Sequence, residues 1–227
     1  LSKRLKLHKN NVFRLLATLE SRGYIEQNKA TENYRLGIRC LQLGQTYVLQ
    51  MGLLRQAHTV IEELARVSVR ETAFLAVFHR ETVVPVDAVE PDRPVRMTIS
   101  VGEPLPLHCT AAGKVNLAFM PDPTARESLI ESLPRLTERT VIDRQTLVQE
   151  LEKVAAQGFA IEIGEHIDDV NSIAVPVRDY TRNVVGTLNV SGPAHRVTPE
   201  RLANEITSMV VEAGQKLSNR LGFKGQA

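Results

Sequence analysis

The sequence predicts an α+β protein in which a small basic module precedes a larger, mildly acidic one. Residues 1–40 carry nine basic and three acidic side chains, a net charge of +6, whereas residues 41–227 have a net charge of −4. Apolar residues within 10–36 change from a helical to an alternating spacing. Residues 56–227 contain strand-like runs joined by hairpins, with helical runs between and after them.

Residues 1–37 predict a winged helix-turn-helix module. The chain starts with what looks like the end of a helix, and a short turn follows at residues 7–9. The second helix has one apolar stripe, formed by Val12, Leu15, Leu16 and Leu19. Gly23 is placed to end this helix in a left-handed conformation. Residues 24–27 and 34–36 then alternate like the two strands of a wing.

Residues 38–55 predict a linker helix that is more apolar than a solvated helix needs. Ile38 and Leu41 belong to its apolar face. Packing against the linker of a second subunit would bury these side chains, and packing on the same domain is the alternative. We therefore expect three parts, at residues 1–37, 38–55 and 56–227.

The third part predicts a mostly antiparallel sheet with helices packed against it. Its strands are expected at residues 72–78, 83–89, 95–101, 159–163, 173–178 and 184–190. Its helices are expected at residues 57–69, 110–120, 144–157 and 198–221. Gly158 is placed to end one of these helices, and Thr198 is placed to cap the last.

Several classes of protein are excluded by composition. The chain has no run of about 18 apolar residues, so a membrane-spanning helix is not expected. The basic start at Lys3 and Arg4 is not followed by an apolar stretch, so a secretory signal is not expected. Cys40 and Cys109 do not make a disulfide framework, which favours a reducing cytoplasm.

The polar half of the second helix predicts contact with a polyanion. Its side chains suit phosphate oxygens and base edges in a major groove, and the turn of the wing suits backbone phosphate. A solvated helical face is the alternative. The positive charge, the preceding turn, the glycine stop and the wing together favour DNA. The candidate DNA-binding residues are Lys9, Asn10, Asn11, Arg14, Thr18 and Lys29.

Two sets of motifs resemble the IclR family of bacterial transcription regulators, and together they cover nearly the whole chain. The DNA-binding motif is similar over residues 1–20, 23–25 and 34–37, and the later signatures are similar over 105–114 and 188–193. In the family a further helix precedes this motif. We therefore expect that helix before Leu1, and we expect the apolar face of the winged module to be incompletely covered.

The residues of the larger module also predict an anion site. Thr110 can cap a helix that starts at Ala111, and the small side chains of Ala111 and Ala112 let a ligand approach the helix N-terminus. Asn189 and Ser191 are two residues apart on a strand and therefore share a face. Hydrogen bonds to neighbouring backbone groups are the alternative role for this polar pair.

The resemblance implies that the larger module has a GAF-like fold that binds small organic acids or aromatic metabolites. It places Ala111 and Ala112 at a carboxylate, and it places Ser172 at a position that is often Cys. Val170 and Met97 are candidates for apolar walls. The candidate effector-binding residues are Ala111, Ala112, Glu162, Ser172, Asn189 and Ser191.

Enzymatic and metal-binding alternatives have weaker support. His108 and Cys109 adjoin a helix start, which can activate a thiol, but no third group orients them. Residues 165–169 include Glu165, His166, Asp168 and Asp169, whose spacing matches no firm metal signature. The chain has no glycine-rich phosphate motif. We expect no catalytic residue, no metal and no cofactor.

The sequence thus predicts a cytoplasmic, ligand-responsive transcription regulator rather than an enzyme. Its expected partners are a palindromic operator DNA, a small organic acid and further copies of itself, as a homodimer or a dimer of dimers, with no membrane partner. A metabolite-binding or enzymatic domain with an incidental basic arm is the main alternative. A purely structural dimerisation module is the second.

Overall fold

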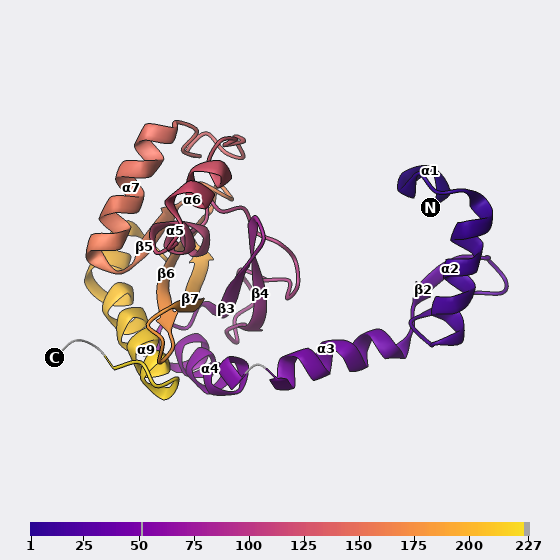
Figure 1. The fold of residues 1–227 in the computed structure, drawn as a ribbon. Helices are drawn as coiled ribbons and strands as arrows, with labels where there is room; N and C mark the ends of the chain where they lie inside the picture. Colours follow the sequence, from indigo (N-terminus) through magenta and orange to yellow (C-terminus); the bar gives the residue numbers. More distant parts are fainter. Residues whose placement is uncertain (51, 225–227) are drawn as a thin grey trace. The chain divides into compact units, whose positions relative to one another are not determined.

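The computed structural model describes residues 1–50 and 52–224, which divide into two compact units, Leu1–Gly52 and a second unit that begins at Leu53 (Figure 1). The predicted linker of residues 38–55 includes Met51, which lies outside the described residues. The elements of the first unit are α1 (Ser2–Leu5), α2 (Lys9–Ser21), β1 (Ile25–Gln27), β2 (Tyr34–Leu36) and α3 (Ile38–Gln50).

The first unit contains the predicted second helix and wing. His8 is the N-cap of α2, so Lys9 begins the helix instead of ending the turn. Gly23 has a φ of +74°, which is the left-handed conformation expected after the helix. β1 and β2 are antiparallel, with Glu26 opposite Arg35. The wing therefore follows α2 directly, as the alternation of apolar residues predicted.

The apolar stripe of α2 is only partly covered. Val12 is buried, Leu16 is half-buried, and Leu15 and Leu19 are 51% and 41% exposed. The prediction of an inward-facing stripe therefore holds fully only for Val12. The described part of this unit offers only short α1, the two-stranded wing and α3 as partners, and these elements leave one side of α2 open.

The second unit is built around a five-stranded sheet. Its helices and helical turns are α4 (Gly52–Glu63), a π-helical turn at Leu64–Ser68, α5 (Ala111–Ala118), α6 (Pro123–Leu129), α7 (Arg144–Gln157), α8 (Pro199–Arg201), a π-helical turn at Leu202–Ile206 and α9 (Thr207–Arg220). Its strands are β3 (Thr72–His79), β4 (Thr82–Val89), β5 (Ala160–Ile163), β6 (Val170–Arg178) and β7 (Val184–Pro193). The strand order is β4-β3-β7-β6-β5, and every neighbouring pair is antiparallel.

Helices cover both faces of this sheet (Figure 1). On one face, Ala174 of β6 packs in a buried cluster with Ala111 and Val115 of α5. The next residue, Val175, faces α9, where a Cβ added to Gly214 would lie 2.5 Å from its Cγ2 atom. Because successive strand residues point to opposite faces, the unit has three layers. The predicted α+β architecture, an antiparallel sheet flanked by helices, is confirmed.

The predicted strand at residues 95–101 is wrong. This segment is irregular, and Val95 and Val101 are 62% and 59% exposed. Among the described residues, the outer edge of β4 has one isolated bridge, between Val83 and Leu105, and accepts one hydrogen bond from the N–H of Gly102 at the carbonyl of Pro85. An alternating sequence becomes a strand only when its own backbone hydrogen bonds reach a sheet edge, and no described hydrogen bond joins the backbone of residues 95–101 to β4. The segment is held instead by Thr72, whose hydroxyl donates to the carbonyl of Met97.

Local end signals set the helix boundaries elsewhere in the second unit. Asp143 caps α7, and Gly158 ends it with a φ of +85°. Thr198 caps the helical segment that leads into α9, as predicted. No helix among the described residues is long and apolar enough to cross a bilayer.

Replacement of Gly113 by Ala should destabilise the second unit. A Cβ at this position would lie 2.1 Å from the carbonyl oxygen of Leu107 and 2.4 Å from its Cα. Both atoms are backbone, so α5 must move away from the loop before it. Overpacking of this kind costs about 1–3 kcal/mol, which exceeds the benefit of about 1 kcal/mol from removing a helical glycine. Urea unfolding should show the loss.

Ala155→Ser is the matched control, because it adds one atom to an exposed position of α7. Its free energy of unfolding should stay within about 0.5 kcal/mol of wild type. Equal stability of Gly113→Ala and Ala155→Ser would contradict the close approach of α5 to Leu107.

Candidate functional site

A row of polar side chains crosses the inner face of the sheet. Thr72 of β3 is the register partner of Ser191 on β7, which is opposite Ser172 on β6, which in turn is opposite Glu162 on β5. Directly opposed residues share a face, so the register aligns all four side chains. All four are buried. The sheet therefore presents a polar row to the layer that contains α5.

A small cavity lies between this row and the start of α5, and all six candidate effector residues line it. The cavity volume is about 30 Å³, which is enough for one or two water molecules. Met97 and Val170, proposed as apolar walls, also line it. The full lining comprises Phe74, Met97, Ile99, Leu105, Thr110, Ala111, Ala112, Glu162, His166, Ile167, Val170, Ser172, Asn189 and Ser191.

The N-terminus of α5 forms one wall. The Thr110 hydroxyl accepts the N–H of Gly113 at 3.0 Å and donates to the carbonyl of Pro106 at 2.7 Å. The N–H groups of Ala111 and Ala112 stand at the first two helical positions, where no intrahelical acceptor exists. Because the positive end of the helix dipole lies here too, this wall favours an acceptor with negative charge.

Glu162 is the acidic member of the opposite wall. Its Oε1 atom accepts the N–H groups of Glu165 at 2.8 Å and of His166 at 3.2 Å. Burial raises the pKa of Glu162 to about 7, against the opposing effect of these hydrogen bonds and of one from Ser172. Glu162 therefore titrates near neutral pH, which is unusual for a glutamate.

Lys114, the residue after Gly113 on α5, does not contribute its charge to the cavity. Its side chain is 2% exposed, and its Nζ atom contacts Glu165 at 2.5 Å and Glu150 at 2.8 Å. These contacts neutralise the ammonium group. Successive residues of a helix are rotated by about 100°, so the side chain of Lys114 points away from the side of α5 where Ala111 and Ala112 line the cavity.

The cysteine and metal alternatives find no support in the geometry. Burial raises the pKa of the Cys109 thiol to about 12, so the thiol stays protonated at neutral pH. The Nε2–H of His108 donates to the carbonyl oxygen of Pro134 at 2.9 Å. Within residues 1–50 and 52–224, no group of three or more His, Cys, Asp and Glu is arranged to hold a metal ion.

Sequence reasoning missed six of the lining residues. They are Phe74, Ile99, Leu105, Thr110, His166 and Ile167. Phe74 is the register partner of Asn189, so its place in the cavity follows from strand pairing and has no local sequence signal. Thr110 was identified as a helix cap, and its position beside Ala111 could have indicated the cavity.

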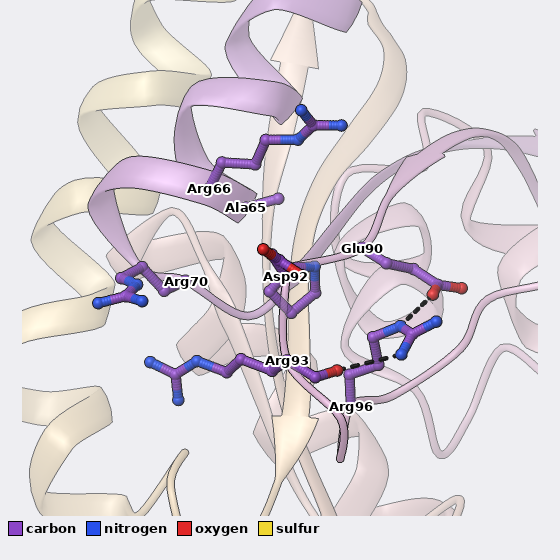
Figure 2. Close-up of a pocket in the computed structure, with 8 residues that line it drawn as sticks. Ala65, Arg66, Arg70, Glu90, Asp92, Arg93 and Arg96 are labelled. Carbon is purple, nitrogen blue, oxygen red and sulfur yellow. Dashed lines mark hydrogen bonds and ion pairs between the residues drawn. The ribbon is translucent and has the colours of Figure 1, made fainter.

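A larger hollow of about 530 Å³ lies on the surface of the same unit. Figure 2 shows its charged lining, in which Arg96 donates to Glu90 and to the carbonyl of Arg93. Arg93 also pairs with the buried carboxylate of Glu71. Because these cations are engaged and none of the candidate effector residues lies here, we place the candidate site at the smaller cavity. The hollow is lined by Ala65, Arg66, Arg70, Glu90, Pro91, Asp92, Arg93 and Arg96.

The candidate DNA-binding residues of the first unit are all exposed. They are Lys9, Asn10, Asn11, Arg14, Thr18 and Lys29. By helical rotation Asn10, Arg14 and Thr18 share one face of α2, whereas Lys9 lies off that face, nearer the apolar stripe. The hydroxyl of Thr18 donates to the carbonyl of Arg14 at 2.8 Å, so its hydrogen is already used within the helix.

The tip of the wing is a turn stabilised by Asn28. Its side-chain oxygen accepts the N–H groups of Ala30 at 2.9 Å and of Thr31 at 3.2 Å. Lys29 stands inside this turn and is exposed. Arg35 on β2 pairs with Glu26 on β1 at 2.7 Å, so its charge is compensated within the wing. Lys29 is thus the exposed cation of the turn.

Glu162→Gln should change how stability depends on pH. The pKa of Glu162 in the folded state, about 7, exceeds its ordinary value of 4.5, so ionisation is harder in the folded state. Wild type should therefore lose up to about 3 kcal/mol of stability as pH rises from about 4.5 to 7. Glutamine keeps an oxygen that can accept the two backbone N–H groups and removes this loss. Urea unfolding at pH 5, 6, 7 and 8 measures the difference.

Glu152→Gln supplies the matched comparison, since Glu152 is exposed on α7. Its pH profile should follow that of wild type. A Glu162→Gln profile parallel to wild type over the same range would show that the buried carboxyl is not the group that titrates.

Comparison with known proteins gives consistent matches along the chain. The family model described as bacterial transcriptional regulator IclR C-terminal matches residues 45–219, and the IclR helix-turn-helix domain matches residues 1–29. The glycerol operon regulatory protein of Streptomyces griseus is 35% identical over 220 residues, which cover 96% of this chain and 85% of that protein.

Solved structures have the same fold. A putative IclR transcriptional regulator from Silicibacter sp. TM1040 superposes with a TM-score of 0.87 at 27% identity, covering 98% of this chain and 87% of that one. An IclR homologue from Microbacterium hydrocarbonoxydans, complexed with 4-hydroxybenzoate, superposes with a TM-score of 0.82 at 24% identity, covering 97% and 89%. The second likeness concerns the fold alone.

These matches confirm the resemblance that the sequence motifs indicated. They also confirm the prediction that the chain is a regulator and not an enzyme, because the matched family consists of transcriptional regulators. The chain belongs to the IclR family of bacterial transcriptional regulators.

Proposed function

We propose that the small cavity of the second unit binds a small organic acid and that its occupancy controls operator binding by α2 and the wing. The observation that carries this proposal is the convergence of all six candidate effector residues on one cavity. A helix N-terminus with free N–H groups supports a carboxylate at one wall. The relative from Microbacterium hydrocarbonoxydans, which binds 4-hydroxybenzoate, supports an acid of this size.

The closed state of the cavity suggests how occupancy is communicated. A volume of about 30 Å³ cannot hold a benzoate-sized molecule, so binding displaces part of the lining. Met97 and Ile99 belong to the irregular segment between β4 and α5 and have no strand partner. If this segment moves when an acid binds, the acid has different affinities for two arrangements of the protein. Such a difference in affinity is what allows a ligand to shift DNA binding.

The DNA side of the proposal rests on exposure and charge. Arg14 is exposed on α2 and has no carboxylate partner among the described residues. Ile38, Leu41 and Leu43 of α3 are 61%, 57% and 56% exposed, which supports pairing with another copy of the chain. A two-fold dimer, alone or within a dimer of dimers, would read a palindromic operator in the cytoplasm.

Arg14→Ala in the full-length protein should weaken operator binding about tenfold to a hundredfold. A guanidinium that bonds a base edge contributes roughly 1–3 kcal/mol of discrimination. Fluorescence anisotropy with operator DNA and with a scrambled duplex measures both affinity and base preference. Unchanged affinity and preference would rule out α2 as the recognition helix.

Arg66→Ala is the control, since it removes one exposed arginine from the second unit. It should leave operator affinity unchanged.

For the wild-type protein, the logarithm of the operator affinity should fall linearly with the logarithm of the salt concentration, because bound phosphates release counterions. Lys29→Ala should make this slope shallower by about one, and a flat wild-type dependence would contradict phosphate contacts.

Asn189→Leu and Ser191→Leu should each abolish the response to acid while operator binding persists. Leucine fills the cavity and removes a polar atom from its wall. A thermal-shift and calorimetric screen of small carboxylic acids, including 4-hydroxybenzoate and pyruvate, identifies the binding acid. The same titration is then repeated with both variants and with operator DNA present.

Gln215→Leu, on the face of α9 outside this cavity, serves as the control and should respond like wild type. Normal calorimetric titrations of both cavity variants would refute the assignment of the site.

A further inference from the structure

The side-chain amide of Asn189 has a fixed orientation. Its Nδ2 atom donates to the carbonyl of Thr187 at 2.8 Å, to the Thr187 hydroxyl at 3.1 Å and to the carbonyl of Phe74 at 3.3 Å. Carbonyl oxygens only accept, so rotation of the amide by 180° would set oxygen against oxygen. Nitrogen therefore faces the strands, and Oδ1 is the atom left over.

This Oδ1 atom is a buried acceptor with no hydrogen-bond partner among the described residues. Asn189 is 1% exposed and lines the cavity between α5 and the sheet. A buried amide oxygen that is left unpaired is destabilising, so a donor supplied by an occupant of the cavity would recover that free energy.

The rest of this wall also offers acceptors. Ser172 and Ser191 share one hydrogen bond, with their hydroxyl oxygens 2.7 Å apart, and Ser172 bonds to the Glu162 side chain. When Glu162 is ionised, Ser172 must donate to it, and Ser191 then donates to Ser172. In this ionised state both hydroxyl hydrogens are used within the wall, which leaves lone pairs for an occupant.

The opposite wall offers donors. The N–H groups of Ala111 and Ala112 begin α5, and Thr110 occupies only the N–H of Gly113. An occupant that satisfies both walls must therefore present an acceptor to α5 and a donor to β7. A plain carboxylate meets only the first requirement.

From this polarity we propose that the effector is a hydroxy acid, whose carboxylate faces the N-terminus of α5 and whose hydroxyl donates to Oδ1 of Asn189. The proposal rests on the proposed function, because it specifies the ligand of the same cavity. The class includes aliphatic and aromatic hydroxy acids. The 4-hydroxybenzoate bound by the relative from Microbacterium hydrocarbonoxydans is a member of it.

Matched pairs of acids test the proposal on the intact wild-type protein. The probes are 4-hydroxybenzoate and 3-hydroxybenzoate against benzoate, 4-hydroxybenzoate against 4-fluorobenzoate, and lactate against propionate, all titrated calorimetrically. At least one hydroxy acid should bind, and its partner without the hydroxyl should bind about tenfold more weakly or worse, because Oδ1 then stays unpaired. The pair that shows the difference identifies the aromatic or the aliphatic subclass.

Asn189→Ala removes the acceptor without filling the cavity and should reduce this ratio of affinities to near one, whereas Arg66→Ala should preserve it. Equal affinity of wild type for a hydroxy acid and its partner would overturn the inference while leaving acid binding intact. A ratio that survives in Asn189→Ala would do the same. Failure of every acid to bind wild type would overturn the proposed function itself. The wild-type ratio needs no variant, so a poorly folded Asn189→Ala leaves the test decisive.

Discussion

The close contact between α5 and the loop before it determines the candidate site. The Cα of Gly113 lies so near the backbone of Leu107 that no side chain fits between them. This contact, together with the Thr110 cap, sets the first turn of α5 above the inner face of the sheet. Free N–H groups and a polar row of side chains therefore face each other across a small cavity. Neither wall alone would specify a ligand.

The polar row is costly for the fold, and this cost connects stability with function. A buried carboxyl and a buried amide oxygen without a partner both reduce the stability of the second unit. The raised pKa of Glu162 reflects the unfavourable burial of its carboxyl group. For Asn189, the unfavourable group is the Oδ1 atom, which has no hydrogen-bond partner among the described residues. An occupant with complementary groups would recover part of this free energy, which makes the same residues suitable for sensing a ligand.

The two units differ in net charge and in the exposure of their candidate binding residues. The first unit is basic and keeps its candidate DNA contacts in solvent, whereas the second buries its candidate contacts in the sheet–helix layer. Phosphate recognition needs accessible cations, because it depends on displacing counterions. Recognition of a small acid needs enclosure, because hydrogen bonds discriminate best where water is excluded. The same chain therefore places its polar residues in opposite environments.

Local signals in the sequence determined most of the helices, and together with the family resemblance they identified six cavity residues. Caps such as Thr110 and Thr198 act within a few residues, so they can be read without the fold. The resemblance added Glu162 and Ser172 to the cavity residues, and Gly158 and the apolar periodicity supplied boundaries. Only the tertiary structure decided that residues 95–101 form no strand, that Lys114 turns to Glu165, and that Phe74 stands beside Asn189. These facts depend on strand register and on which sheet edges are free, and hydrogen bonds between distant segments set both.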